Sequence, residues 1–235
     1  MRKTVLFLVL PILFLISCSS DIETSTASTL SNAAGESGAT TTESDSIITT
    51  TSTMPEISPE LKELIDKGIA VNSIKYIEGM SKDVLHIKGN KVKRELFEKR
   101  GLSDDDRYDE VYLDASDKKA YAVCESQICS SLVKKKFWEV DYDEFKPKDT
   151  PLDTLNSIVS GSIDKKRSKQ IGSVPAYLVT FENNEGNTGE LWISLYYGIP
   201  YEVNVNSITI IFEDIAVNNV KDEDVIIIPV GYTEK

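Results

Sequence analysis

The chain has 235 residues, and its 38 acidic and 26 basic side chains give a formal net charge of −12 and an isoelectric point near 4.7. This balance excludes nucleic acid as a partner and argues against binding an anionic lipid surface by long-range attraction. Residues 58–235 amount to roughly 175 residues, which suffices for one sizeable hydrophobic core.

The first 17 residues have the pattern of a secretory signal peptide. A basic start, Arg2-Lys3, precedes an apolar run over residues 5–16. This run is shorter than the roughly 20 residues of a membrane-spanning helix. The sequence Leu-Ile-Ser-Cys at 15–18 resembles the lipobox of bacterial and archaeal lipoproteins, in which the Cys is lipidated and the preceding peptide removed. An ordinary signal peptide or an uncleaved anchor with a chance cysteine is the alternative.

The lipobox resemblance implies an extracytoplasmic protein that is anchored through a lipidated Cys18 to the cell membrane or cell surface. Each buried CH₂ of an acyl chain such as palmitate contributes about 0.8 kcal/mol, and one chain alone binds only reversibly. A doubly or triply acylated Cys18 would therefore hold the protein permanently.

Residues 18–57 are predicted to form a disordered, acidic tether. About half of residues 19–53 are Ser or Thr, acidic residues are scattered among them, and Lys and Arg are absent. With so few large apolar side chains, burial cannot offset the entropy of ordering the segment. A flexible coil of about 40 residues spans roughly 35 Å. The tether is either a stalk that lifts the domain off the membrane or a spacer with no specific role.

Two helices are predicted in the domain that follows. The first covers residues 59–67, with Ser58 as its cap, Pro59 at its first position and Gly68 at its end. Its apolar residues share one face: Leu61, Leu64 and Ile65. The second is expected over residues 151–160, within the run 150–160, and is ended by Gly161. It begins at Pro151 and carries apolar residues at helical spacing: Leu152, Leu155, Ile158 and Val159.

The remainder is predicted to be mostly β-strand. The first strands are expected at 71–78, 84–88, 91–97, 110–114, 119–124 and 138–142, with turns at 89–90 and 115–117. Four more follow at 174–182, 189–196, 201–205 and 208–215. Short loops between these last strands indicate an antiparallel meander. The sequence therefore predicts an α+β domain over 58–235: a curved antiparallel sheet, or half-open β-barrel, packed against one or two helices.

Cys124 and Cys129 remain once Cys18 is assigned to lipid. In an oxidising compartment this pair predicts a disulfide. Zinc binding is the alternative, but it would need about four ligands, and His86 is the only histidine of the chain.

No catalytic constellation is visible, so we do not expect an enzyme, a metal or a cofactor. His86 lies in a predicted strand with no Ser-His-Asp or Cys-His pattern around it. The acidic runs 104–106 and 222–224 lack the ligand spacing of a calcium loop and are read as solvated turns. Lys134-Lys135-Lys136, beside Phe137 and Trp138, is either an exposed turn or a local contact for lipid headgroups.

Several stretches resemble the LolA/LolB-like family of lipoprotein carriers. Residues 208–218 form an alternating strand that runs into an aromatic-x-Asp-aliphatic-x-x-Asn turn, and 220–229 follow as an expected final strand. Upstream, 189–193 with 198–200 resemble the penultimate hairpin of that family. Residues 87–95 resemble its strand-turn-strand that places an Arg on the sheet.

This resemblance implies an unclosed barrel whose helices cover an apolar cavity for acyl chains or another hydrophobic ligand. Arg94 matches the family's lid-contacting Arg, while Leu191, Ile193 and Leu195 mark one face of a strand and complete the candidate ligand cleft. That face is either a cavity wall or a core filled by the two helices. The lipobox and the cysteine pair depart from the family, so shuttling of lipoproteins is not expected.

The leading hypothesis is a membrane-anchored, non-catalytic module that binds lipid, acyl chains or another hydrophobic molecule. The alternative is an envelope module on the same scaffold that binds or senses a protein partner and has a filled core without a ligand.

Overall fold

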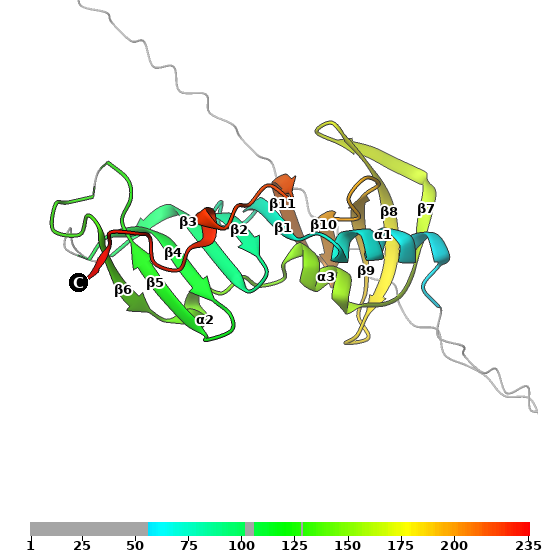
Figure 1. Cartoon of the computed structure of the whole chain (residues 1–235). Helices are drawn as coiled ribbons and strands as arrows, with labels where there is room; N and C mark the ends of the chain where they lie inside the picture. Colours follow the sequence, from blue (N-terminus) through cyan, green and yellow to red (C-terminus); the bar gives the residue numbers. More distant parts are fainter. Residues whose placement is uncertain (1–55, 102–105, 128) are drawn as a thin grey trace, which may run out of the picture. The chain divides into compact units, whose positions relative to one another are not determined.

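The computed structural model describes residues 56–101, 106–127 and 129–235 (Figure 1). The predicted signal peptide, Cys18 and the tether up to residue 55 lie outside the described residues, as do residues 104 and 105 of the first acidic run. Ile57, which precedes the predicted domain boundary, forms a parallel β-bridge with Gly161.

Within the described residues, twelve strands form one sheet in the order β12-β6-β5-β4-β3-β2-β1-β11-β10-β9-β8-β7. The strands are β1 Ser73–Glu78, β2 Val84–Lys88, β3 Lys91–Arg100, β4 Tyr108–Asp114, β5 Lys119–Val123, β6 Lys136–Val140, β7 Ile158–Ile171, β8 Val174–Asn183, β9 Thr188–Ser194, β10 Pro200–Val205, β11 Ile208–Val217 and β12 Thr233–Glu234. All neighbours pair antiparallel except β12 with β6. The sheet is not closed, and the predicted α+β fold with an antiparallel sheet is confirmed.

Two meanders build this sheet. The chain runs from β1 to β6 and later from β7 to β11, and β1 pairs with β11 to join the two series (Figure 1). The predicted turns at 89–90 and 115–117 connect β2 to β3 and β4 to β5. The meander expected from the short C-terminal loops is likewise confirmed from β8 to β11.

Helix α1, Pro59–Ile69, forms as predicted, with one small difference at its end. The Ser58 side chain accepts a hydrogen bond from the N–H of Leu61, and Pro59 occupies the first turn. The apolar face is buried. The helix continues through Gly68 because the missing side chain of Gly68 lets α1 approach the backbone of Gly198.

Helix α3, Pro151–Ser157, is shorter than predicted. Thr150 and Asp153 form a capping box at its start. Ile158 and Val159, which were expected to continue the helix, instead begin β7. Pairing of β7 with β8 outweighs the helical spacing of these residues, because the strand gains a ladder of backbone hydrogen bonds and buries Ile158.

The C-terminal segment is the second correction. The strand predicted over 220–229 is wrong: the segment contains a short 3₁₀ helix, η1 Glu223–Val225, and packs against β2 and β3. Val220 and Val225 are buried there without strand pairing. The strand predicted over 138–142 also shifts, since β6 ends at Val140 and a short helix, α2 Tyr142–Phe145, follows.

One hydrophobic core runs along the face of the sheet that carries α1, α2 and α3, which we call the inner face. Leu61 and Leu155 of the helices meet Val179, Leu191 and other buried strand residues on this face. Within the described part of the chain, no helix is both long and apolar enough to cross a bilayer.

Candidate functional site

A cleft of about 370 Å³ lies beside helix α3, and we call it the α3 cleft. Three parts of the chain surround it: α3 together with Asp149, the β8–β9 loop, and the β10–β11 hairpin. Its lining residues are Asp149, Asp153, Thr154, Ser157, Phe181, Asn183, Asn184, Glu185, Asn187, Val203, Val205, Asn206, Ile208 and Ile210.

Backbone and side-chain hydrogen bonds fix the β8–β9 loop against α3. The Asn183 side-chain oxygen accepts hydrogen bonds from the N–H groups of Glu185, at 3.1 Å, and Asn187, at 2.9 Å. The N–H of Asn184 donates to the carbonyl of Ser157 at 2.8 Å. The rim of the cleft is therefore held in place by the last residue of the helix.

The β10–β11 hairpin presents an apolar wall. Val203 pairs with Ile210 and Val205 with Ile208, so all four side chains project from the same, inner face. A two-residue turn, Asn206-Ser207, with φ of 53° and 65°, sets this register.

The apolar wall is only partly covered. Val203 and Phe181 are buried at the base of the cleft, Val205 and Ile210 are half-buried, and Ile208 is 64% exposed. A graded apolar surface with a polar rim and a volume within the roughly 300–1,000 Å³ of ligand pockets is typical of a small-molecule site.

A larger hollow, of about 720 Å³, is lined mainly by Ser, Thr, Asn and Glu residues. It lies largely on the outer face of the sheet, where Ser162, Thr180, Glu190 and Asn204 form a row across four strands. Hydroxyl, carboxylate and amide groups of this kind suit water better than an apolar molecule. The smaller α3 cleft is the better candidate for a hydrophobic ligand.

The cleft residues suggested by the sequence lie elsewhere. Leu191 and Ile193 are fully buried in the core on the inner face, and Leu195 packs against the same core while remaining half-buried. Arg94 lies on β3, in the other meander. None of the four lines the α3 cleft. Its actual residues come largely from loops and turns rich in Asn, which sequence reasoning read as connectors.

Arg94 has a full set of partners on the inner face. Its guanidinium contacts Asp83 and Glu78, each at 2.7 Å, and donates to the carbonyl of Phe145 in α2 at 3.2 Å. Arg94 thus joins β1, β3 and the loop before β2 to a covering helical segment.

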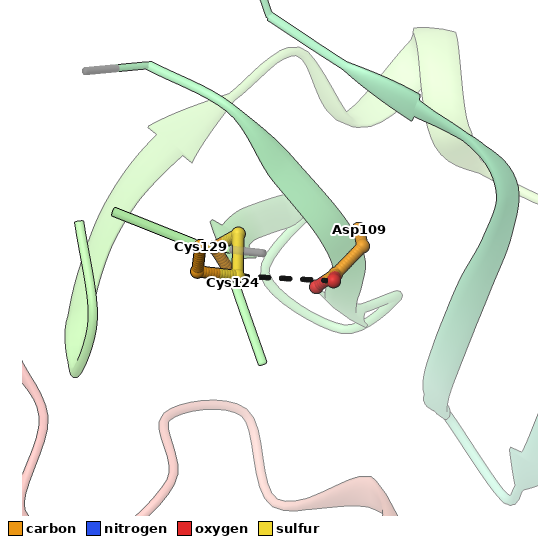
Figure 2. A group of neighbouring side chains, drawn as sticks. All are labelled: Asp109, Cys124 and Cys129. Carbon is orange, nitrogen blue, oxygen red and sulfur yellow. Dashed lines mark hydrogen bonds between the residues drawn. A yellow bond between two sulfur atoms is a disulfide. The ribbon is translucent and has the colours of Figure 1, made fainter. Parts of the chain in front are cut away.

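Cys124 and Cys129 form the predicted disulfide, and the carboxylate of Asp109 lies beside it (Figure 2). Asp109 accepts hydrogen bonds from the N–H groups of Glu125 and Ser126, at 2.8 and 3.0 Å, and so holds the loop between the cysteines. The Cys129 sulfur is 3.9 Å from Asp109, a contact that is a hydrogen bond only in the reduced thiol.

These three residues are the potential metal-ligand group found within the described ranges. The disulfide uses both sulfurs, which leaves one carboxylate that already accepts backbone hydrogen bonds. The group does not include His86, so the zinc alternative finds no fourth ligand there. Trp138 packs against the disulfide rather than extending the lysine run into a surface site.

His86 is buried on the outer face of β2, with its Nε2 3.0 Å from the Glu95 carboxylate. The contact with His86, supported by the charge of Lys93, lowers the pKa of Glu95 to about 2. Burial, by contrast, raises the pKa of Glu110, the second carboxylate beside Lys93. This network is structural, since its groups are paired with one another on a face that the C-terminal segment packs against.

No family model matches the chain, and no curated protein matches it. Solved structures with a related arrangement include MucB, at 11% identity and a TM-score of 0.36, which aligns over 70% of this chain and 60% of MucB. The Pseudomonas aeruginosa MucA/MucB complex aligns at 12% identity and a TM-score of 0.29, over 70% of this chain and 58% of the other. The chain thus spans less than two thirds of these MucB structures.

A LolA superfamily protein from Nitrosomonas europaea aligns at 9% identity and a TM-score of 0.26, over 71% of this chain and 97% of the other. Likenesses at this level carry no functional argument.

Proposed function

We propose that the chain is an extracytoplasmic lipoprotein, anchored through Cys18, whose folded domain binds a small hydrophobic molecule in the α3 cleft. The partly uncovered apolar wall of the cleft carries this proposal. Ile208 exposes 64% of its surface at a hollow whose base is formed by buried apolar residues. Covering an aliphatic side chain contributes about 1.5–3 kcal/mol, so a ligand that covers Ile208 gains binding energy from an existing surface.

The experiment compares two isoleucines of the same strand. Ile208 lies in the α3 cleft, whereas Ile211, which is 43% exposed, pairs with Glu202 and faces the other side of the sheet. Ile208→Gln and Ile211→Gln therefore make the same chemical change on opposite faces. Binding of decanol to the full chain carrying Cys18→Ser would be measured by titration calorimetry for each variant.

We expect Ile208→Gln to weaken decanol binding at least about tenfold, since 1.4 kcal/mol corresponds to a factor of ten, and Ile211→Gln to leave it unchanged. Equal weakening by both variants would place the ligand elsewhere. An absence of decanol binding would remove the proposal and favour the protein-binding alternative.

The anchor is tested separately. Mass spectrometry of the native protein should show a chain that begins at an acylated Cys18. An unmodified Met1 terminus would refute the anchored arrangement without affecting the cleft.

A further inference from the structure

All charged side chains that line the α3 cleft are acidic. Three carboxylates are present, those of Asp149, Asp153 and Glu185, together with the carboxamides of Asn183, Asn184, Asn187 and Asn206. None of the lining residues within the described chain is Lys, Arg or His. The neighbouring Lys148 is not part of the lining.

The three carboxylates differ in how far the protein already uses them. Asp153 accepts hydrogen bonds from the N–H and hydroxyl of Thr150 at 3.1 and 2.7 Å, as part of the capping box of α3. Glu185 accepts one bond, from the Asn187 side chain at 3.1 Å. Asp149 has no hydrogen-bond or ion-pair partner within the described residues. Asp149 and Glu185 therefore keep acceptor capacity for a ligand.

We infer that the α3 cleft selects an amphiphile with a protonated amine at its polar end, and that it rejects fatty acids and anionic phospholipids. This inference rests on the proposed function and adds the chemical class of the ligand. An ammonium group donates up to three hydrogen bonds, and the free carboxylates and carboxamide oxygens of the rim accept them. A carboxylate or phosphate in the same place would face like charges and would have no cationic partner.

The apolar and polar parts of the cleft stand in the order that such a ligand requires. Phe181 and Val203 lie buried at the base, while Asp149 and Glu185 belong to the surface loops at the rim. A ligand whose alkyl chain enters first and reaches the base therefore leaves its polar end beside the carboxylates.

The test uses three ligands with the same ten-carbon chain: decylammonium, decanol and decanoate, each below the concentration at which it self-associates or separates from water. Their dissociation constants for the full chain carrying Cys18→Ser would be measured at 0.1 M salt. We expect decylammonium to bind at least about tenfold more tightly than decanoate, with decanol between them, because the rim carboxylates attract the ammonium group and repel the carboxylate.

A matched pair of variants separates the cleft from the general negative charge of the protein. Asp149→Asn/Glu185→Gln removes two charges at the rim, and Glu98→Gln/Asp117→Asn removes two from exposed positions elsewhere. The first double variant should reduce the preference for decylammonium to within about threefold, and the second should keep it.

The outcomes are distinct. If decanol does not bind, the proposed function itself fails. If decanol binds but decylammonium and decanoate bind equally, the cleft is a hydrophobic site without charge selection, and only this inference is overturned. A preference that survives Asp149→Asn/Glu185→Gln would come from the whole protein and would also overturn it.

Discussion

Replacing Arg94 with methionine should lower the free energy of unfolding by about 3 kcal/mol. Removing one partner from a buried ion pair typically costs about 3–5 kcal/mol, because the remaining charge stays buried and uncompensated. The Arg94 side chain is 11% exposed, and those of its partners Asp83 and Glu78 are 7% and 21% exposed. Methionine retains most of the aliphatic stem, so the loss reports on the charge rather than on packing.

The structure places the expected loss at the lower end of that range. Asp83 retains a hydrogen bond from the N–H of Phe97, at 2.8 Å, after the arginine is removed. Glu78 is exposed enough to be hydrated. The carbonyl of Phe145 loses its donor, which should also loosen α2.

Urea denaturation at equilibrium, followed by tryptophan fluorescence, measures this loss. Lys82→Met is the control, since Lys82 pairs with Glu213 at 2.7 Å but both side chains are more than 40% exposed. That variant should lose less than about 1 kcal/mol. Equal losses for Arg94→Met and Lys82→Met would refute the reasoning. Unchanged stability with abolished decanol binding would instead give Arg94 a ligand-binding role, as the carrier resemblance suggested.

Three further predictions concern the packing and the outer-face network. Gly198→Ala should lose at least about 3 kcal/mol in urea denaturation, because a Cβ would overlap a carbonyl oxygen of α1 in addition to the positive-φ strain. Gly172→Ala, with a similar φ of 59° and nothing within 4 Å, should lose only about 1–2 kcal/mol. Tyr76→Phe should raise the free energy of unfolding, measured by thermal unfolding, by about 1 kcal/mol, since the Tyr76 hydroxyl is buried without a hydrogen-bond partner in the described structure. A lower free energy of unfolding in this variant would mean that the hydroxyl does have a partner. The pKa of Glu95 falls from 4.5 to about 2 through its contact with His86, so the contact stabilises the fold above pH 4.5 and is lost as the pH falls toward 2. The wild type should be more stable than Glu95→Gln by at most about 1 kcal/mol, because the Glu95 side chain is 37% exposed and its charge is screened by solvent. This difference in the free energy of unfolding should therefore shrink between pH 5 and pH 2.

Local signals predicted most of the sheet. Alternating residues bounded by turn residues located β2, β5 and the strands from β8 to β11, because each of these strands has one buried face and short connections. The Ser58-Pro59 start located α1 for a similar reason: its capping bond is made within four residues.

Features that depend on distant partners were missed. Edge strand β7 contains the run Lys165-Lys166-Arg167, which has no partner on β8 because the register shifts between Asp164 and Ser168. Such a strand shows no apolar alternation. Conversely, the apolar run 225–230 has the composition of a strand but packs as irregular chain, because β12 and not this run pairs with β6.

The candidate site was missed for the same physical reason. Its apolar wall was recognised as strand, but nothing local shows that α3 fails to cover Val205 and Ile208. The carrier resemblance directed attention to Leu191 and Ile193, which alternate in the same way. Their complete burial depends on a core shared with side chains far away in the sequence, such as Leu61 of α1.

The length of α3 connects the incorrect helix prediction to the cleft. The predicted helix over 151–160 would be about 15 Å long at 1.5 Å per residue, whereas the seven residues Pro151–Ser157 reach only about 10 Å. The six residues of β10 extend about 20 Å at 3.4 Å per residue. A helix that ends at Ser157 is thus about half as long as the strand beside it and is too short to cover it. Because Ile158 leaves the helix to pair with Asn183, the far end of the β10–β11 hairpin keeps its apolar side chains without a cover. The strand pairing that ends α3 early therefore also creates the surface on which the proposed ligand binds.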